Sequence, residues 1–176
     1  MKRQKTFLFA GVVAVATLFS YCKKPTQFKE IQVANLFSLQ APVYLNATAG
    51  DFPFPVALQY ASDSLGVFLM VIDTSREGMN ENNLKMYYDS IVSQPFIDSV
   101  KITKPQLVKV DNDSAYTSEM IGNTNGIKVF YEIEAIATKQ RYYTILTWAK
   151  LDKKEALKPD MIKMLSSFRD ISHKKI

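Results

Sequence analysis

Three glutamates are spaced so that they could act together on one substrate or one ion. Two segments with strand patterns flank Asn125-Gly126, a dipeptide typical of a two-residue hairpin turn. Counting outward from that turn pairs Glu119 with Glu132 and leaves Glu134 two residues further along the same face. Because like charges directly opposed on a sheet are unfavourable, such a cluster needs a cation, a shared proton or water between its carboxylates.

The glutamate cluster has three interpretations. In the first, the glutamates form a polar patch that is solvated or paired with Lys and Arg. In the second, they act as an acid and base pair, as in a hydrolase, and in the third they are the ligands of a divalent ion. A second turn at Lys139-Gln140 would place Thr147 beside Glu132 on the same face. A four-residue loop through 123–126 would instead shift the register and separate the glutamates.

The chain lacks the residues that other common kinds of catalytic site require. His173 is the only histidine and Cys22 the only cysteine, so the chain cannot form a zinc site or a Cys/His or Ser/His/Asp nucleophile system. The glycines form no phosphate-binding loop and no G-x-S-x-G turn. Asp111 and Asp113 resemble the start of a calcium loop, but the Gly and Glu that such a loop requires are absent. We therefore predict no metal, no cofactor and no enzymatic activity of these kinds.

The distribution of charge argues against a nucleic-acid partner. The chain has 22 Lys and Arg against 17 Asp and Glu, a formal net charge of +5. Three of the basic residues lie in 1–21, and four more lie at 23–24 and 174–175, which leaves 15 against 17 in the folded body. A nucleic-acid-binding protein needs a basic surface on that body. Residues 171–176 are interpreted as a solvated basic tail.

The N-terminus has the pattern of a secretory signal peptide at residues 1–21. Lys2, Arg3 and Lys5 form a positive segment, and 6–21 then carry no charge. As a helix this uncharged run extends only about 24 Å, which is shorter than the roughly 30 Å hydrocarbon core of a bilayer. Removal of the segment is therefore expected.

Cys22 directly after this run resembles the bacterial lipoprotein signal, in which the cysteine becomes the lipidated first residue. Tyr21 stands where that signal usually has a small residue. The alternatives are cleavage after Ala14-Val15-Ala16 and retention of the run as an anchor. Lipidation predicts a protein of the bacterial cell envelope, periplasm-facing or at the outer membrane, that is attached through 22–33 as a tether.

Residues 34–170 are expected to form one domain of the α+β class, an antiparallel β-sheet meander flanked by helices. Alternating apolar residues predict strands at 35–42, 56–62, 65–74, 106–110, 115–122, 128–138 and 141–151. One helix is predicted at 81–94 with Asn80 as its cap, and another is predicted to begin at Pro159, because proline inside a helix costs roughly 3 kcal/mol. The face opposite the glutamates is predicted to be core and carries Tyr116, Met120, Tyr131, Ile133, Leu146 and Trp148.

The order of these elements resembles the PsbP-like family. The resemblance rests on "FSLQAP", "LQYASDSLGVFLMVIDTSREGMNENNLKMYYDSIV", "VFYEIEAIATKQRYYTILTWA" and a final helix with "SSFRD". It implies an α/β/α sandwich around an antiparallel sheet. Members of the family include a photosystem oxygen-evolving subunit, a Ran-binding nuclear import factor and envelope lipoproteins of the DcrB type. The resemblance therefore implies a scaffold that binds other macromolecules rather than a shared active site.

Together these observations predict a non-catalytic, lipid-anchored envelope protein that binds another envelope protein. The loop "DFPFP" at 51–55 is the candidate contact, since Phe52 and Phe54 are large apolar side chains between prolines. Both phenylalanines could instead cap the core. Two other functions remain open: a carboxylate-based ion-binding protein or hydrolase at the glutamate cluster, and a carrier of a small apolar ligand between helix and sheet.

Overall fold

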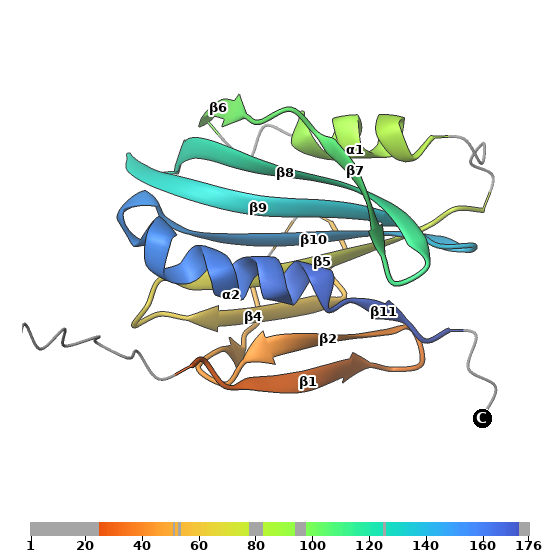
Figure 1. Ribbon diagram of the computed structural model, residues 1–176, viewed down its shortest axis with the longest axis horizontal. Coiled ribbons are helices and arrows are strands. Elements are labelled where there is room, and N and C mark those ends of the chain that lie inside the picture. Colours follow the sequence, from red (N-terminus) through yellow and green to blue (C-terminus); the bar gives the residue numbers. More distant parts are fainter. Residues whose placement is uncertain are drawn as a thin grey trace, which may run out of the picture.

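The computed structural model describes residues 25–172, except for Asp51, Pro53, Asn125 and the ranges 78–82 and 94–97. The predictions for the signal peptide, for Cys22 and for most of the C-terminal tail concern residues outside this description. The elements, shown in Figure 1, are β1 (Phe28–Val33), β2 (Phe37–Pro42), β3 (Asn46–Ala47), β4 (Leu58–Ser62), β5 (Val67–Ser75), α1 (Leu84–Val92), β6 (Asp98–Ile102), β7 (Gln106–Val110), β8 (Asp113–Thr124), β9 (Ile127–Ala137), β10 (Arg141–Lys150), the 3-10 turn η1 (Leu151–Lys153), α2 (Lys154–Ser166) and β11 (Arg169–Asp170).

Among the described residues, the large sheet contains eight antiparallel strands. Seven follow the order β3-β4-β5-β10-β9-β8-β6, and β7 pairs with another part of β8 on the same edge as β6. This order departs from the predicted simple meander at one place, because β5 pairs with β10 rather than with the strand that follows it in the chain. The departure has a physical reason. Strand β5 carries apolar side chains on both faces, and a position inside the sheet buries both of them.

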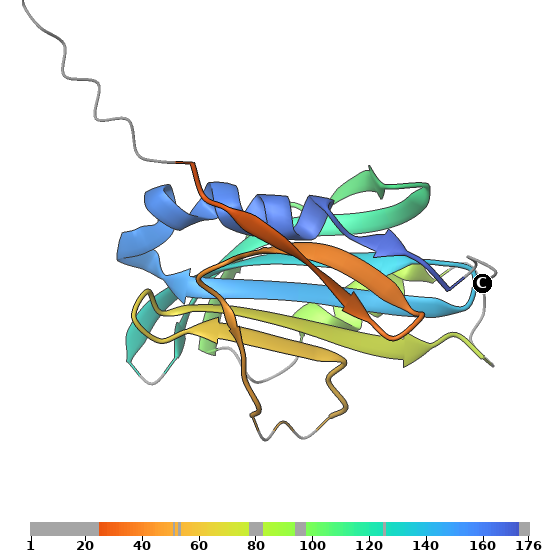
Figure 2. The same ribbon diagram turned by 90° about the horizontal axis from the view of Figure 1, so that it is seen from below.

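Each face of the large sheet is covered by one helix, as Figure 2 shows from the edge of the sheet. On one face α1 packs against a cluster built around Tyr131 and Ile133. On the other face α2 packs together with a second sheet of order β1-β2-β11 against a cluster around Phe130 and Ile136. The predicted α+β class is confirmed, and the alternation of β9 between the two clusters follows from its period of two.

Strand β1 corrects the predicted domain boundary at residue 34. The strand lies within 22–33, which the sequence analysis assigned to the tether, and it pairs with β2 along its whole length from Phe28 to Val33. Its side chains alternate, so that Ile31 is buried while its neighbours are more exposed. The folded part of the chain therefore includes these six residues. A tether can extend only through the residues before Thr26, because the Thr26 hydroxyl donates to Asp160 Oδ2 at 2.9 Å and the Gln27 carbonyl accepts from the Val43 N–H at 2.9 Å.

The two helices differ from their predicted limits. Helix α1 begins at Leu84 after Asn83, which makes no side-chain capping hydrogen bond, and the predicted cap Asn80 lies outside the described residues. Helix α2 begins at Lys154 and contains Pro159 in its second turn, so the prediction of a start at the proline was wrong. The buried stripe explains the difference, because Leu157 continues it before the proline. None of the helices in the described ranges is long and apolar enough to cross a bilayer.

Replacing Pro159 with alanine should stabilise the protein. Pro159 is exposed and cannot donate a hydrogen bond to the carbonyl of Glu155, so alanine restores one helical bond. Proline costs about 3 kcal/mol relative to alanine in a helix, and its restriction of the unfolded chain offsets about 1 kcal/mol of this. We expect Pro159→Ala to raise the free energy of unfolding by about 2 kcal/mol in urea denaturation. The exposed neighbour Glu155→Ala is the control and should change it by less than about 0.5 kcal/mol. A Pro159→Ala protein no more stable than the native one would contradict this expectation.

Candidate functional site

The structure confirms the predicted pairing of the glutamates. Strand β9 pairs with β8 so that Glu132 lies opposite Glu119 and Glu134 lies opposite Thr117. Gly126, in the turn between these strands, has a φ of +79°, which glycine adopts without strain. The two-residue turn therefore sets the register that brings three carboxylates onto one face of the sheet.

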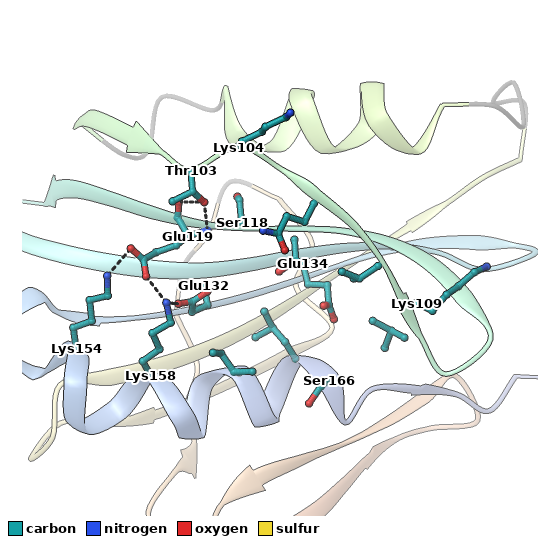
Figure 3. Close-up of a pocket in the computed structure, with 16 residues that line it drawn as sticks. Thr103, Lys104, Lys109, Ser118, Glu119, Glu132, Glu134, Lys154, Lys158 and Ser166 are labelled. Carbon is teal, nitrogen blue, oxygen red and sulfur yellow. Dashed lines mark hydrogen bonds and ion pairs between the residues drawn. The ribbon is translucent and has the colours of Figure 1, made fainter.

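This face is covered by α2, so the glutamates form the floor of a groove (Figure 3). The groove has a volume of about 600 Å³ and lies between strands β7 to β9 and the helix. Glu132 and Glu134 keep only 6% and 4% of their surface exposed. An ionised carboxylate at such a depth is costly unless charge or hydrogen bonds compensate it. The partners of each glutamate therefore decide its charge.

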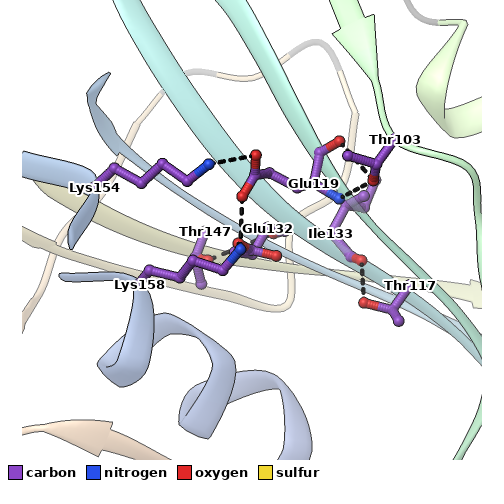
Figure 4. A network of polar contacts seen from close by, with 8 residues as sticks. All are labelled: Thr103, Thr117, Glu119, Glu132, Ile133, Thr147, Lys154 and Lys158. Carbon is purple, nitrogen blue, oxygen red and sulfur yellow. Dashed lines mark hydrogen bonds and ion pairs between the residues drawn. The ribbon is translucent and has the colours of Figure 1, made fainter. Parts of the chain in front are cut away.

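Glu119 receives two ammonium groups from the first two turns of α2 (Figure 4). Lys154 Nζ lies 2.6 Å from Glu119 Oε1, and Lys158 Nζ lies 2.7 Å from Oε2. Burial acts to raise the pKa of Glu119, but the hydrogen bonds and charges of the two lysines outweigh it and hold the pKa below its ordinary value. The backbone N–H of Glu119 donates to the Thr103 hydroxyl at 3.0 Å. Glu119 is therefore an ionised and well-held residue at neutral pH.

Glu132 shares one of these lysines. Lys158 Nζ lies 3.3 Å from Glu132 Oε1, and the Thr147 hydroxyl donates to the Glu132 backbone carbonyl at 3.5 Å. Thr147 on β10 lies opposite Glu132 on β9, as the second predicted turn requires. Burial raises the pKa of Glu132, and the charge of Lys158 offsets only part of this rise. One ammonium group thus lies between the two opposed carboxylates and compensates their repulsion.

Glu134 has no such compensation. Its Oε1 is buried and has no hydrogen-bond partner among the described residues. The hydroxyl of Thr117, which lies opposite Glu134 on β8, is not free to donate to it, because it donates to the carbonyl of Ile133 at 3.1 Å. Burial raises the pKa of Glu134 to about 7. At neutral pH this carboxyl is therefore divided between its protonated and ionised forms.

The geometry agrees with the lysine-paired interpretation for two of the three glutamates. Lys154 and Lys158 contact the carboxylate oxygens that a divalent ion or a substrate would otherwise approach. In the ranges that the structure describes, no group of three or more His, Cys, Asp and Glu side chains is placed to hold a metal ion. The ion-binding and hydrolase alternatives therefore gain no support from this site.

Sequence reasoning missed both lysines. It expected the last helix to begin at Pro159, which would have left Lys154 and Lys158 in a connection without a defined direction. Their spacing of four residues places two side chains on the same helical face, and this was the available signal. The expectation that proline does not occur inside a helix led away from this signal, because the helix that carries the lysines contains Pro159.

The predicted contact residues Phe52 and Phe54 have different environments. Phe52 is 40% exposed, whereas Phe54 is partly buried and packs against the cluster on the α1 side. Their ring centroids are 5.7 Å apart. Phe52 also lines a small apolar pocket of about 180 Å³, together with Phe68 and Trp148, whose rings stack with centroids 5.0 Å apart. Phe54 therefore caps the core, whereas Phe52 remains at the surface, where a partner could contact it.

Removing the shared lysine should destabilise the protein more than removing the other one. Lys158→Met leaves the buried Glu132 without a cation, whereas Lys154→Met leaves Glu119 paired with Lys158. Because Lys158 is partly exposed, we expect its loss to cost about 1–2 kcal/mol rather than the 3–5 kcal/mol of a fully buried pair. Lys154→Met is the matched control and should cost about half as much. Urea denaturation at pH 7 measures both, and equal costs would contradict the shared role of Lys158.

Glu134 should make the protein less stable as the pH rises. A carboxyl whose pKa is about 7 in the folded state and 4.5 ordinarily binds more protons when folded, so stability is lost between these values. At about 1.4 kcal/mol per pKa unit, the loss between pH 4.5 and pH 8 is about 3 kcal/mol. We expect this component to disappear in Glu134→Gln, measured as the free energy of unfolding against pH. The other charged groups that line the groove are unchanged in this variant and cancel in the comparison: Lys104, Lys109, Glu119, Glu132, Lys154 and Lys158. Parallel pH profiles for the two proteins would show that Glu134 does not titrate in this range.

Comparison with known proteins gives similar structures but no similar sequences. No family model and no curated protein matches this chain. Cyanobacterial PsbP from Synechocystis sp. PCC 6803 is 12% identical, and it superposes with a TM-score of 0.57 over 83% of this chain and 94% of its own. LpqN, involved in cell envelope biogenesis of Mycobacterium tuberculosis, is 10% identical, with a TM-score of 0.58 over 82% of this chain and 91% of its own.

A third similar structure comes from a eukaryote. The Ran-binding protein Mog1p of Saccharomyces cerevisiae is 9% identical, with a TM-score of 0.55 over 84% of this chain and 97% of its own. At these identities the likeness concerns the fold. It covers almost the whole length of each compared protein and agrees with the fold that the sequence segments predicted. The chain therefore has the PsbP-like fold.

Proposed function

We propose that this protein is a non-catalytic, lipid-anchored protein of the bacterial cell envelope that binds another envelope protein. The fold supports this proposal, because it is shared with LpqN, which takes part in cell envelope biogenesis, and with Mog1p, which binds Ran. The signal pattern in 1–21 and Cys22 supports an envelope location. Neither the family resemblance nor the groove supplies a shared catalytic centre.

The observation that carries the proposal is the exposed aromatic surface around Phe52. A phenylalanine side chain that is 40% exposed leaves apolar area in water, and burying it against a partner is favourable. Beside it, the stacked rings of Phe68 and Trp148 border an apolar pocket of about 180 Å³. This volume suits a single apolar side chain better than a drug-sized ligand, which needs at least about 300 Å³. The surface therefore favours a protein contact over the carriage of a small apolar molecule.

Lipid at Cys22 would hold this surface close to the membrane. The Thr26 hydroxyl donates to Asp160 Oδ2 at 2.9 Å, so the chain is already bound to the folded body at Thr26. Extended residues span at most about 3.5 Å each, so a tether from Cys22 to Thr26 reaches only about 14 Å. Each buried methylene of the acyl chains contributes about 0.8 kcal/mol to anchoring. The domain would thus search for a partner within a thin layer at one membrane surface.

Loss of Phe52 should remove the partner without unfolding the protein. We expect Phe52→Ala to lower the yield of the main cross-linked partner by at least about tenfold, which corresponds to about 1.4 kcal/mol of lost binding energy. Quantitative mass spectrometry of proteins cross-linked and co-purified from solubilised membranes measures the yield. Phe54→Ala should both lower the yield and reduce stability, since Phe54 also packs on the core.

Two variants complete this experiment. Leu107→Ala removes an even more exposed apolar side chain on β7, 64% exposed, and should leave the partner yield unchanged. Cys22→Ala should release the protein from the membrane and reduce the yield through the loss of local concentration. If Phe52→Ala and Phe54→Ala remained folded and retained every partner of the native protein, the proposed contact would be wrong.

A further inference from the structure

The groove beneath α2 presents three carboxylates to a helix that supplies two ammonium groups. Lys154 and Lys158 are four residues apart and bind Glu119 and Glu132. The next residue in this series is Ile162, which also lines the groove and is 46% exposed. The series of lysines therefore ends one turn before the part of the floor where Glu134 lies (Figure 3).

Glu134 lines this groove and is buried in its floor, so it is not a surface residue. It is only 4% exposed, and its Oε1, like Glu132 Oε1, has no hydrogen-bond partner in the described part of the chain. Glu132 differs because Lys158 Nζ lies 3.3 Å from its Oε1 as an ion pair. Figure 3 shows its carboxyl among the residues that line the groove, with no interaction drawn to it, while Glu119 and Glu132 are joined to lysines. Lysine charges act on the pKa values of Glu119 and Glu132, whereas burial alone shifts that of Glu134. The two helical lysines thus compensate only their own partners.

The residues around Glu134 define what it could bind. A buried carboxylate is stabilised most by a cation that also donates hydrogen bonds to it. A divalent metal ion would need six or more oxygen ligands, and both oxygens of Glu119 already bind lysine. An anionic ligand would place a second acid against Glu134. A monovalent organic cation avoids both difficulties.

We propose that the groove binds an organic primary ammonium ion, whose charged group pairs with Glu134 and whose alkyl chain lies along Val108, Ile162 and Leu165. These apolar side chains line the same groove as the glutamate. The volume of about 600 Å³ falls within the range of small-molecule sites, about 300–1,000 Å³. The site lies on the α2 face, whereas Phe54 packs on the α1 side, so it is separate from the proposed protein contact.

The positive charges at the rim of the groove do not prevent this binding. Lys104 and Lys109 are exposed, and Lys109 Nζ donates to the Ser114 hydroxyl at 3.0 Å. Exposed charges are screened by salt over about 8–10 Å, whereas the pairing of an ammonium ion with a desolvated carboxylate is screened much less. The lysines at the rim therefore slow the association of an ammonium ion more than they weaken its binding to Glu134.

Three matched probes test the proposal on the full-length protein in a non-ionic detergent. The probes n-butylammonium, butanol and pentanoate carry the same four-carbon alkyl chain with a cationic, neutral or anionic head. NMR of the labelled glutamate carboxyl groups follows both binding and titration. We expect only n-butylammonium to shift the Glu134 signal and to lower its titration midpoint by about one pH unit. Its affinity should fall at least about tenfold between pH 8 and pH 5, because the proton competes with it.

Two substitutions make the test specific. Ile162→Lys continues the lysine series, so that the helix itself pairs with Glu134 and n-butylammonium no longer binds; Ile162→Met is the control and retains binding. Glu134→Gln keeps the shape of the side chain, removes its charge and should abolish binding. The other NMR signals should remain those of the folded protein. Binding of pentanoate or butanol at this site, binding that survives in Glu134→Gln, or no binding of any probe would overturn the proposal.

The ammonium group could belong to a free amine or to a lysine side chain of another protein. Nα-acetyl-lysine methylamide carries the same four-carbon stem and separates these sources. Binding tighter than that of n-butylammonium would assign the site to a protein lysine. Equal or weaker binding would assign it to a free amine.

Discussion

The burial of carboxylates beneath α2 is the constraint on which the rest of this face depends. An ionised group at that depth destabilises the fold by several kcal/mol unless a partner compensates it. The helix meets this requirement for Glu119 and Glu132 with Lys154 and Lys158, which lie beside its apolar stripe. Helix α2 therefore both covers the sheet and compensates the negative charge of these two glutamates. Any slide of the helix along the sheet would separate both glutamates from their lysines at once.

This constraint explains why α2 tolerates an internal proline. A helix that began at Pro159 would leave both lysines in the preceding connection, and Leu157 would lose its buried position. Burial of a leucine side chain contributes about 1.5–3 kcal/mol, and the loss of a cation beside a buried carboxylate costs a similar amount. Together these exceed the roughly 3 kcal/mol that proline costs in a helix. Local propensity is overridden here by packing and charge from residues that lie far away in the sequence.

The sequence was informative where the controlling interaction is local. The turn at Asn125-Gly126 determines the register of β8 and β9, so the opposition of Glu119 and Glu132 could be predicted from a dipeptide and a count. The pairing of β5 with β10 could not, because it depends on which strands have two apolar faces once the whole sheet is assembled. The partners of the glutamates were missed for a related reason. They lie on a helix whose start is set by tertiary contacts rather than by its own residues.

The three glutamates also show how one face of a sheet can hold identical side chains in different charge states. Glu119 has two ammonium partners and a lowered pKa, Glu132 shares one, and Glu134 has burial alone. The gradient follows the helix, because a turn of α2 that carries lysine is succeeded by a turn that carries Ile162. On the α1 side, the described residues of the core cluster are apolar and aromatic. The larger apolar cluster lies on the α2 side, so the face that contributes most of the apolar core also keeps a carboxyl whose charge a ligand or a proton can change.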